Sequence, residues 1–275
     1  MTDRIIRIFD VLTEKKRIKI NSLAEVLDVS QVTLPRDLDI LEKKDIICRT
    51  HGYVSLDGAD VTAKRMAFSY PIKRRIARAA AQTIREGETI LLDSGSCCAL
   101  LCEELAATGK RNTIISNSIY IANYVRHMPN IKMLLLGGQY QPESQTLVGS
   151  LTVKCAQNFY TDKFFLGVNG FIPDFGFSCR DLMRAETANE LTKYTKKVFI
   201  LTESAKFQQR GAFNLLQFEK ITGIFTDDKI PKEAEEKLIK NNVKVNKVSS
   251  VNESYKMLNN RSLLISLRKL ASRGP

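Results

Sequence analysis

The sequence predicts an α/β domain with a mainly parallel sheet, preceded by a small helical domain that ends in a β-hairpin. The length of 275 residues suits two domains, because a domain typically has about 100–200 residues. From residue 89 onward, strand-like apolar runs alternate with helical stretches, which indicates a parallel sheet covered by helices. We therefore expect domains over residues 1–58 and 73–248, a connector over 59–72, and a tail over 249–275 to which the sequence assigns no role.

Three short helices are predicted in the first domain. Apolar residues at three- and four-residue spacing predict a helix over residues 3–14. Residues 22–25, Ser-Leu-Ala-Glu, form a capping-box sequence, which predicts that the second helix begins there. Ser30 is a candidate N-cap for a third helix over residues 31–44.

A hairpin follows these helices. Side-chain character alternates over residues 46–50 and again over 53–56, with Gly52 between the two runs. Three helices and a hairpin are typical of a winged helix-turn-helix, whose third helix enters the major groove of DNA while the wing reaches the backbone or minor groove. A three-helix domain that binds protein is the alternative interpretation.

Two segments of this domain resemble the DeoR family of transcription regulators. Residues 32–38, Val-Thr-Leu-Pro-Arg-Asp-Leu, resemble its recognition-helix signature, and residues 49–52, Arg-Thr-His-Gly, resemble its wing. The sequence departs from the family pattern at Pro35, where the first residue of a basic pair is usual, and at Tyr53, where a second wing glycine is usual. The resemblance implies a double-stranded DNA operator as partner, contacted by Ser30, Gln31, Thr33, Arg36, Arg49 and His51.

Charge alone would give a different DNA-binding segment. The net charge is +12, but the first 60 residues hold ten basic and eleven acidic side chains, whereas residues 61–80 hold six basic and no acidic ones. Counting charges would therefore select Lys64–Arg65 and Lys73–Arg75. Asp37, inside the expected recognition helix, would repel DNA phosphates, so we expect it to cap or pair locally.

The larger domain contains six predicted strands, over residues 89–93, 113–116, 131–136, 164–168, 198–202 and 221–226. In such sheets ligands bind beyond the carboxyl ends of the strands. The turn Asp93 to Ser96 leads from a strand into a helix, whose first amides suit an anion. The turns after the next four strands carry hydroxyls, amides, glycines and Lys206, which together suit a polyhydroxy phosphate.

In order and spacing these turns resemble the DeoR-type sensor domain, which is similar in fold to ribose-5-phosphate isomerase and the coenzyme A transferases. The resemblance covers residues 73–247. The cysteines at 97 and 98 replace the hydroxyl residues usual in the phosphate cradle, so backbone amides would serve there. The resemblance implies an effector site made of Asp93, Ser94, Gly95, Ser96, Cys97, Cys98, Ser116, Asn117, Gly138, Asn169, Glu186 and Lys206.

Together these features predict a DNA-binding transcription regulator, a repressor of a sugar-metabolism operon controlled by a phosphorylated sugar. We expect a homo-oligomer, dimer or tetramer, because one small winged domain reads few base pairs. A sugar-phosphate isomerase is one alternative, but Asn169 stands where such an enzyme needs an acid, and only Asp93 or Glu186 could replace it. A DNA-binding protein whose second domain only oligomerises is the other.

The remaining expectations concern location and metals. The sequence has no apolar run of about 20 residues and no secretory signal, so we expect a cytoplasmic protein that does not bind membranes. Six cysteines are expected to be reduced. Cys98 and Cys102 would share a helix face, but with two histidines and no paired Cys-x-x-Cys spacing we expect neither a metal nor a cofactor. An amphipathic helix and a disordered segment remain alternatives for the tail.

Overall fold

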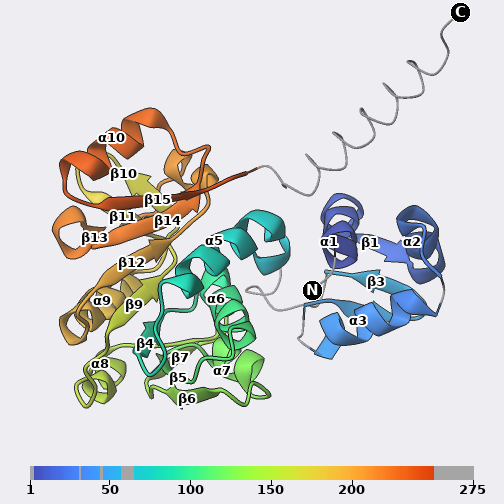
Figure 1. Cartoon of the computed structure of the whole chain (residues 1–275), viewed down its shortest axis with the longest axis horizontal. Coiled ribbons are helices and arrows are strands. Elements are labelled where there is room, and N and C mark those ends of the chain that lie inside the picture. The colour runs from blue at the N-terminus through green and yellow to red at the C-terminus, as the bar shows by residue number, and fades with distance from the viewer. Residues whose placement is uncertain (1–2, 31, 44–45, 57–64, 251–275) are drawn as a thin grey trace, which may run out of the picture.

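The computed structural model describes residues 3–30, 32–43, 46–56 and 65–250 (Figure 1). Two units are visible in these residues. The N-terminal unit contains three helices and a small antiparallel sheet, and the larger unit contains a seven-stranded sheet with helices on both faces. The described residues contain no helix that is both long and apolar enough to span a bilayer.

The helices of the N-terminal unit are α1 (Asp3–Lys15), α2 (Ile20–Leu27) and α3 (Thr33–Lys43). Its sheet has the strand order β1-β3-β2, where β1 is Arg17–Lys19, β2 is Cys48–Thr50 and β3 is Tyr53–Ser55. The hairpin β2-β3 is the predicted wing. Its turn residues His51 and Gly52 both have positive φ, +50° and +80°, as a two-residue type I′ hairpin turn requires. Strand β1 extends the wing to three strands, which the sequence pattern did not indicate.

The predicted start of the second helix is wrong. Helix α2 begins at Ile20, and its N-cap position, Lys19, makes no side-chain cap hydrogen bond. The capping-box serine, Ser22, lies inside the helix. The amide of Ile20 instead donates to the carbonyl of Gly52 in the wing, 2.9 Å away. A contact between distant segments therefore sets this helix start.

Ser30 does cap the third helix. Its hydroxyl oxygen accepts from the amide of Thr33 at 3.2 Å, and its carbonyl accepts from the amide of Leu34 at 3.3 Å. Pro35 is the third residue of α3, within the first turn, where amides have no partner inside the helix. The proline is therefore compatible with this helix start.

All seven strands of the large sheet run parallel, in the order β15-β14-β12-β9-β4-β5-β6. The strands are β4 (Thr89–Leu92), β5 (Asn112–Ser116), β6 (Ile131–Leu135), β9 (Lys163–Leu166), β12 (Val198–Leu201), β14 (Gly223–Asp227) and β15 (Lys244–Val248). The chain proceeds from β4 outward in one direction and from β9 outward in the other. The topological switch point, where such sheets bind ligands, therefore lies between β4 and β9.

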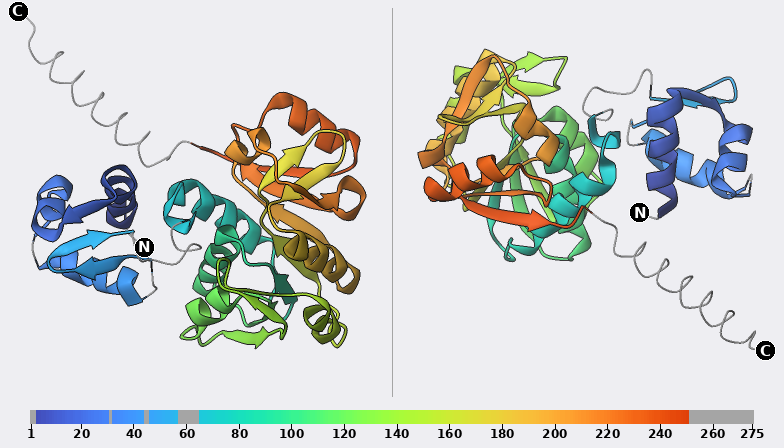
Figure 2. Two further views of the ribbon diagram at one scale, coloured as in Figure 1. Left: turned by 180° about the vertical axis from the view of Figure 1, so that it is seen from behind. Right: turned by 90° about the horizontal axis from the view of Figure 1, so that it is seen from above.

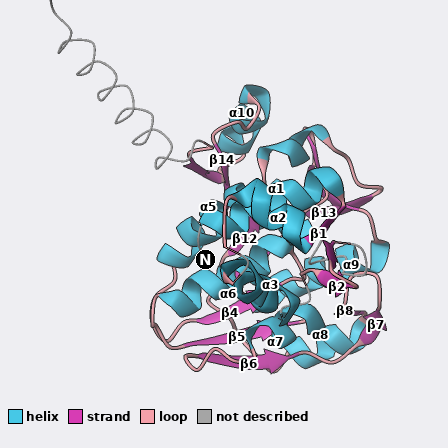
Figure 3. Cartoon of the chain, turned by 90° about the vertical axis from the view of Figure 1, so that its right-hand side faces the viewer, coloured by secondary structure: helices cyan, strands magenta, loops and turns pink. Residues whose placement is uncertain are grey.

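Helices cover both faces of this sheet (Figures 2 and 3). Neighbouring residues of β4 point to opposite sides: Ile90 and Leu92 belong to one hydrophobic core and Leu91 to the other. The first core contains α5 (Tyr70–Gln82), α6 (Ser96–Ala107) and α7 (Ile119–Val125). The second contains residues of α8 (Ser150–Ala156), α9 (Leu182–Leu191) and α10 (Lys232–Lys240).

Two small antiparallel sheets accompany the large one. One has the order β10-β11-β13, from Gly170–Ile172, Gly176–Cys179 and Phe213–Gln217, and the other pairs β7 (Gln139–Gln141) with β8 (Thr146–Val148). Three short 3-10 helices span Thr192–Tyr194, Ser204–Gln208 and Phe218–Lys220.

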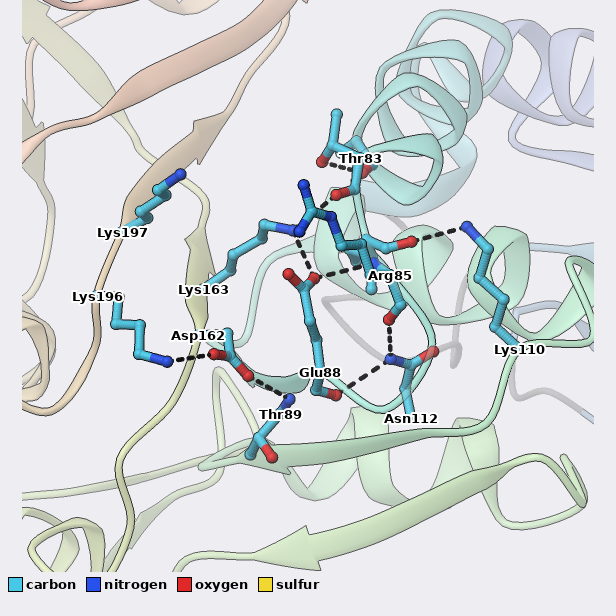
Figure 4. A network of polar contacts seen from close by, with 12 residues as sticks. Thr83, Arg85, Glu88, Thr89, Lys110, Asn112, Asp162, Lys163, Lys196 and Lys197 are labelled. Atoms are coloured by element: carbon cyan, nitrogen blue, oxygen red, sulfur yellow. Dashed lines mark hydrogen bonds and ion pairs between the residues drawn. The ribbon is translucent and has the colours of Figure 1, made fainter.

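The amino ends of the strands are closed by polar contacts (Figure 4). The ammonium of Lys163, whose side chain is 9% exposed, lies 2.5 Å from the Glu88 carboxylate and donates to the carbonyl of Thr83 at 2.6 Å. The side-chain amide of Asn112 donates to the carbonyls of Arg85 and Glu88 at 2.7 and 3.1 Å. These contacts join the segments at the amino ends of the strands, so this edge of the sheet has a structural role.

The two units meet at the amino end of α5 (Figures 1 and 2). The helix begins at Tyr70, so the last three residues of the predicted connector belong to it. Pro71 does not interrupt the helix, because a proline in the first turn removes no helical hydrogen bond. The Tyr70 ring packs against Phe9 of α1, with 4.9 Å between the ring centroids, and both side chains are buried.

Candidate ligand-binding and nucleic-acid-binding sites

A cavity of about 260 Å³ lies beyond the carboxyl ends of β4, β9 and β12, next to the switch point. Each strand supplies the loop that follows it, and the segment before α5, the first turn of α5 and the start of α9 supply the rest of the wall. The lining residues are Arg65, Phe68, Lys73, Gly95, Ser96, Cys97, Gly167, Val168, Asn169, Arg184, Leu201, Thr202, Glu203 and Lys206.

The start of α6 forms one wall of the cavity. Gly95 is the N-cap and Ser96 the first residue of the helix, and both line the cavity with Cys97. The first amides of a helix lack helical partners and carry partial positive charge, which favours an anion. A side chain at Gly95 would come within 3.3 Å of the Gly167 backbone, so glycine allows the loops after β4 and β9 to approach closely.

Basic side chains surround this helix start. Arg65, Lys73, Arg184 and Lys206 line the cavity, with Glu203 as the lining carboxylate. Burial, together with the nearby positive charges of Lys73, Arg180 and Arg65, lowers the pKa of Lys206 from its usual value. An anion that binds beside such a lysine stabilises its charged form.

Arg184 is held at the cavity wall by Asp93, whose carboxylate lies 3.3 Å from the Arg184 guanidinium. Asp93 therefore orients a lining residue and does not itself line the cavity. Within the described residues, the buried Nε of Arg184 and the buried hydroxyl of Ser94 have no hydrogen-bond partner. Buried donors without partners are uncommon, and Arg184 is also one of the residues that line the cavity.

Of the twelve effector residues predicted from the sequence, Gly95, Ser96, Cys97, Asn169 and Lys206 line the cavity. Ser94 and Cys98 are buried beside these residues, and the Cys98 thiol donates to the carbonyl of Phe165 at 3.5 Å. The thiol of Cys97 is protonated, because burial raises its pKa to about 12.

Besides Asp93, four further predicted residues lie outside the cavity lining. Ser116 ends β5 and Asn117 follows it, on the far side of β4 from the switch point. Their side chains donate to the carbonyls of Leu92 and Leu147 at 2.8 and 3.0 Å. Gly138 has a φ of +153°, and a Cβ there would lie 2.0 Å from the Thr152 hydroxyl. Glu186 lines a separate surface pocket between α8 and α9.

The sequence-based prediction did not include the other nine lining residues, of which Arg65, Lys73, Arg184 and Glu203 are charged and Phe68 is aromatic. Arg184 precedes the predicted Glu186 on α9, and Glu203 lies in a strand-end turn that was already singled out. Phe68 is 58% exposed, which is high for a phenylalanine, and it lines the cavity from the connector side. No local pattern in the sequence indicated that the connector reaches this cavity.

The predicted DNA contacts group on α3 and the wing. Arg36 is exposed on α3, and His51 is exposed at the wing turn. The hydroxyls of Ser30 and Thr33 lie 2.8 Å apart at the start of α3. Gln31 lies outside the described residues.

Arg49 is paired within the protein. Its guanidinium contacts the carboxylates of Asp39 and Glu42 on α3, which ties the wing strand β2 to this helix. Asp37, which we expected to be structural, pairs with Arg4 of α1 rather than with a sequence neighbour. Both ion pairs orient α3 against the rest of the N-terminal unit.

The basic residues at the start of α5 make contacts within the protein. Lys73 faces the cavity, and Arg74 and Arg78 pair with the buried Glu104 carboxylate at 2.6 and 2.8 Å. Arg75 donates to the carbonyl of Ser250 at 2.9 Å. These basic side chains are therefore engaged within the protein, and Lys64 lies outside the described residues.

Neither a disulfide nor a cluster of potential metal ligands is found among the described residues. All six cysteines are free thiols. No group of three or more His, Cys, Asp or Glu side chains in the described part of the chain is arranged to hold a metal ion.

A winged helix-turn-helix joined to an α/β domain whose cavity is lined by basic side chains defines a DNA-binding transcription regulator with a separate sensor domain. The chain belongs to the DeoR family. The DeoR-like helix-turn-helix domain matches residues 4–58, and the DeoR C terminal sensor domain matches residues 69–228.

Relatives along most of the chain are transcription regulators. The HTH-type transcriptional regulator GolR of Listeria innocua is 29% identical over 82% of this chain and 90% of its own. The HTH-type transcriptional repressor GlcR of Bacillus subtilis is 27% identical over 84% and 90%. The glycerol-3-phosphate regulon repressor of Escherichia coli is 24% identical over 82% and 90%. Among solved structures, ribose 5 phosphate isomerase A from Neisseria gonorrhoeae matches with a TM-score of 0.38 and 15% identity, over 50% of this chain and 53% of that one.

Proposed function

We propose that this chain represses a sugar-metabolism operon and that a phosphorylated sugar in the cavity controls its affinity for operator DNA. The observation that carries the proposal is the cavity at the switch point, where a helix start and four basic side chains face one lining carboxylate. Such a surface favours an anionic ligand with hydroxyl groups. Relatives named for a glycerol-3-phosphate regulon and as repressors support the same class of function.

In this proposal the phosphate binds the first amides of α6, at Ser96 and Cys97, together with Lys206. Asn169, in the loop after β9, and Arg184, on α9, would form hydrogen bonds with the sugar hydroxyls. Asp93 acts indirectly, through its ion pair with Arg184. Ser116, Asn117, Gly138 and Glu186 are not part of the proposed binding surface.

On the DNA side, we propose that Arg36 and Thr33 of α3 face the operator, with Ser30 at the helix start and His51 at the tip of the wing. Arg36 is the side chain best placed to read a base, because it is a long basic side chain exposed on α3. Arg49 acts by fixing the wing to α3. The chain acts as a homo-oligomer, since paired winged domains read paired half-sites. We place it in the cytoplasm, where it would meet both DNA and sugar phosphates.

We further propose that the cavity binds its sugar phosphate without converting it. Asn169 offers an amide, which cannot accept a proton from a sugar carbon. The Asp93 carboxylate is engaged by Arg184, and Glu203 lies 3.8 Å from the Lys73 ammonium. Ligand then controls DNA binding by preferring one of two arrangements of the protein.

Isothermal titration calorimetry tests the ligand assignment. The full chain is titrated with phosphorylated trioses, pentoses and hexoses, each beside its unphosphorylated counterpart. We expect at least one phosphorylated sugar to bind far more tightly than its neutral form, because the helix start and Lys206 select for charge. Equal affinity for each pair would refute the phosphosugar assignment, and conversion of the sugar during incubation would show an enzyme.

A further inference from the structure

We propose that residues 65–68, which precede the sensor domain, form part of the effector site, and that Lys73 links a bound anion to their backbone. This inference rests on the proposed function, because it concerns the ligand of the same cavity. It goes further in naming the chain segment through which the cavity acts on the DNA-binding unit.

Residues 65–68 form a wall of the cavity. Arg65 and Phe68 both line it, together with the start of α6. Between them, Met66 and Ala67 are buried in the hydrophobic core that also contains α1 and α5. One face of this short segment therefore meets the cavity and the other is anchored in the core.

Lys73 connects this segment to the cavity. Its side chain is 5% exposed, and its ammonium donates to the carbonyl of Arg65 and, at 2.8 Å, to the carbonyl of Phe68. An ammonium has three donors, and the Glu203 carboxylate lies 3.8 Å away on the cavity side. An anion entering the cavity can take the third donor and replace this longer contact with a charge-assisted hydrogen bond.

The same segment leads directly to the contact between the two units. Ser69 has a φ of +57°, a left-handed conformation that is uncommon for serine, and it joins residues 65–68 to α5. The next residue, Tyr70, packs on Phe9 of α1. Only Ser69 therefore separates residues 65–68 from Tyr70, the side chain that packs against the DNA-binding unit.

It follows that an anion held by Lys73 restricts residues 65–68, and that effector and DNA affect each other's affinity through this segment. Lys206 provides the matched comparison, because it lines the same cavity but its ammonium donates to Gln209, 3.2 Å away, and not to residues 65–68. Removing either charge weakens anion binding. Removing Lys73 also disconnects the anion from the segment.

Hydrogen exchange of the wild-type chain provides the first test, with inorganic phosphate as the probe and sodium chloride at matched ionic strength as the control. Phosphate in the cavity should slow amide exchange at residues 96–98 and also at residues 65–69. Slowing at 96–98 with unchanged exchange at 65–69 would overturn the inference. No slowing at either segment would contradict the proposed function itself.

The second test measures DNA affinity by fluorescence anisotropy, using a duplex selected by the full chain from a random-sequence pool. At saturating phosphate we expect the wild type and K206M to shift their DNA affinity by about fivefold or more, and K73M by less than about twofold. A full shift in K73M would overturn the inference. The exchange experiment needs no variant, so it decides the matter if K73M does not fold.

Discussion

Lys206→Met separates the charge of the cavity from its shape. Methionine keeps much of the unbranched stem of lysine but removes the ammonium, which lies at the carboxyl end of β12. Burial already lowers the pKa of Lys206, so its charge lies in surroundings that solvate it poorly. In such surroundings an ion pair with a ligand phosphate is stronger than in water.

The expected loss follows from one charge-assisted hydrogen bond. Such a bond contributes about 1.5–3 kcal/mol, and about 1.4 kcal/mol corresponds to a tenfold change in affinity. Arg65, Lys73 and Arg184 remain in the variant and keep the cavity positive. We therefore expect sugar-phosphate binding to weaken by about tenfold to a hundredfold, whereas the free sugar should lose little affinity.

Isothermal titration of the same sugar phosphate into Lys206→Met and Lys197→Met checks this magnitude. Lys197 is an exposed residue immediately before β12, so its variant makes the same change in net charge at the opposite end of the same strand (Figure 4). Lys197→Met should bind like the wild type. Equal affinities for the two variants would show that general charge, rather than Lys206, attracts the ligand.

Four further predictions concern both units. Arg36→Ala should weaken operator binding by about 1–3 kcal/mol in a gel-shift series, and undiminished affinity would remove Arg36 from the interface. Gly138→Ala should lower the free energy of unfolding, measured in urea, by about 2–5 kcal/mol, because the new Cβ would clash with the Thr152 hydroxyl and the backbone there has a positive φ. Gly137→Ala is the control and should cost far less, because its Cβ would lie 3.4 Å from the nearest atom. Equal losses in the two variants would contradict this. Cys97 in the native chain should react slowly with iodoacetamide at pH 8, because its raised pKa, about 12, keeps the thiol protonated; labelling as fast as in denaturant would refute this. Sugar-phosphate affinity should fall as pH rises through the lowered pKa of Lys206, since the ammonium loses its proton earlier than exposed lysines do, and this alkaline decline should be weaker in Lys206→Met.

Local patterns in the sequence predicted most of the fold. Six of the seven parallel strands have apolar runs, and the five inner ones, β14, β12, β9, β4 and β5, are largely buried, as central strands of such a sheet are. The seventh, β15, was not predicted, because its sequence Lys-Val-Asn-Lys-Val has no apolar run and it lies at the sheet edge. The start of α2 was misplaced because a hydrogen bond from the wing fixes it, and no local sequence signal reports that bond.

The lining of the cavity was predicted only where it comes from the turn directly after a predicted strand. Strand-end turns suggested the start of α6, Asn169 and Lys206, and these do line the cavity. Strand order decides which turns meet, and the sequence did not supply it: Ser116 and Asn117 end a strand on the wrong side of the switch point. Arg65 and Lys73 line the cavity because the segment before α5 and the start of α5 fold against it, and this tertiary contact has no local sequence signal.

The central claim is that an anionic sugar in the cavity changes the affinity of the N-terminal unit for DNA. Its most direct measurement is fluorescence anisotropy of a selected duplex bound to the full chain, with the tightest-binding sugar phosphate and its free sugar added at equal ionic strength. The account predicts that DNA affinity shifts with the sugar phosphate and stays constant with the free sugar. DNA affinity that stays the same when the cavity is saturated with sugar phosphate would contradict it.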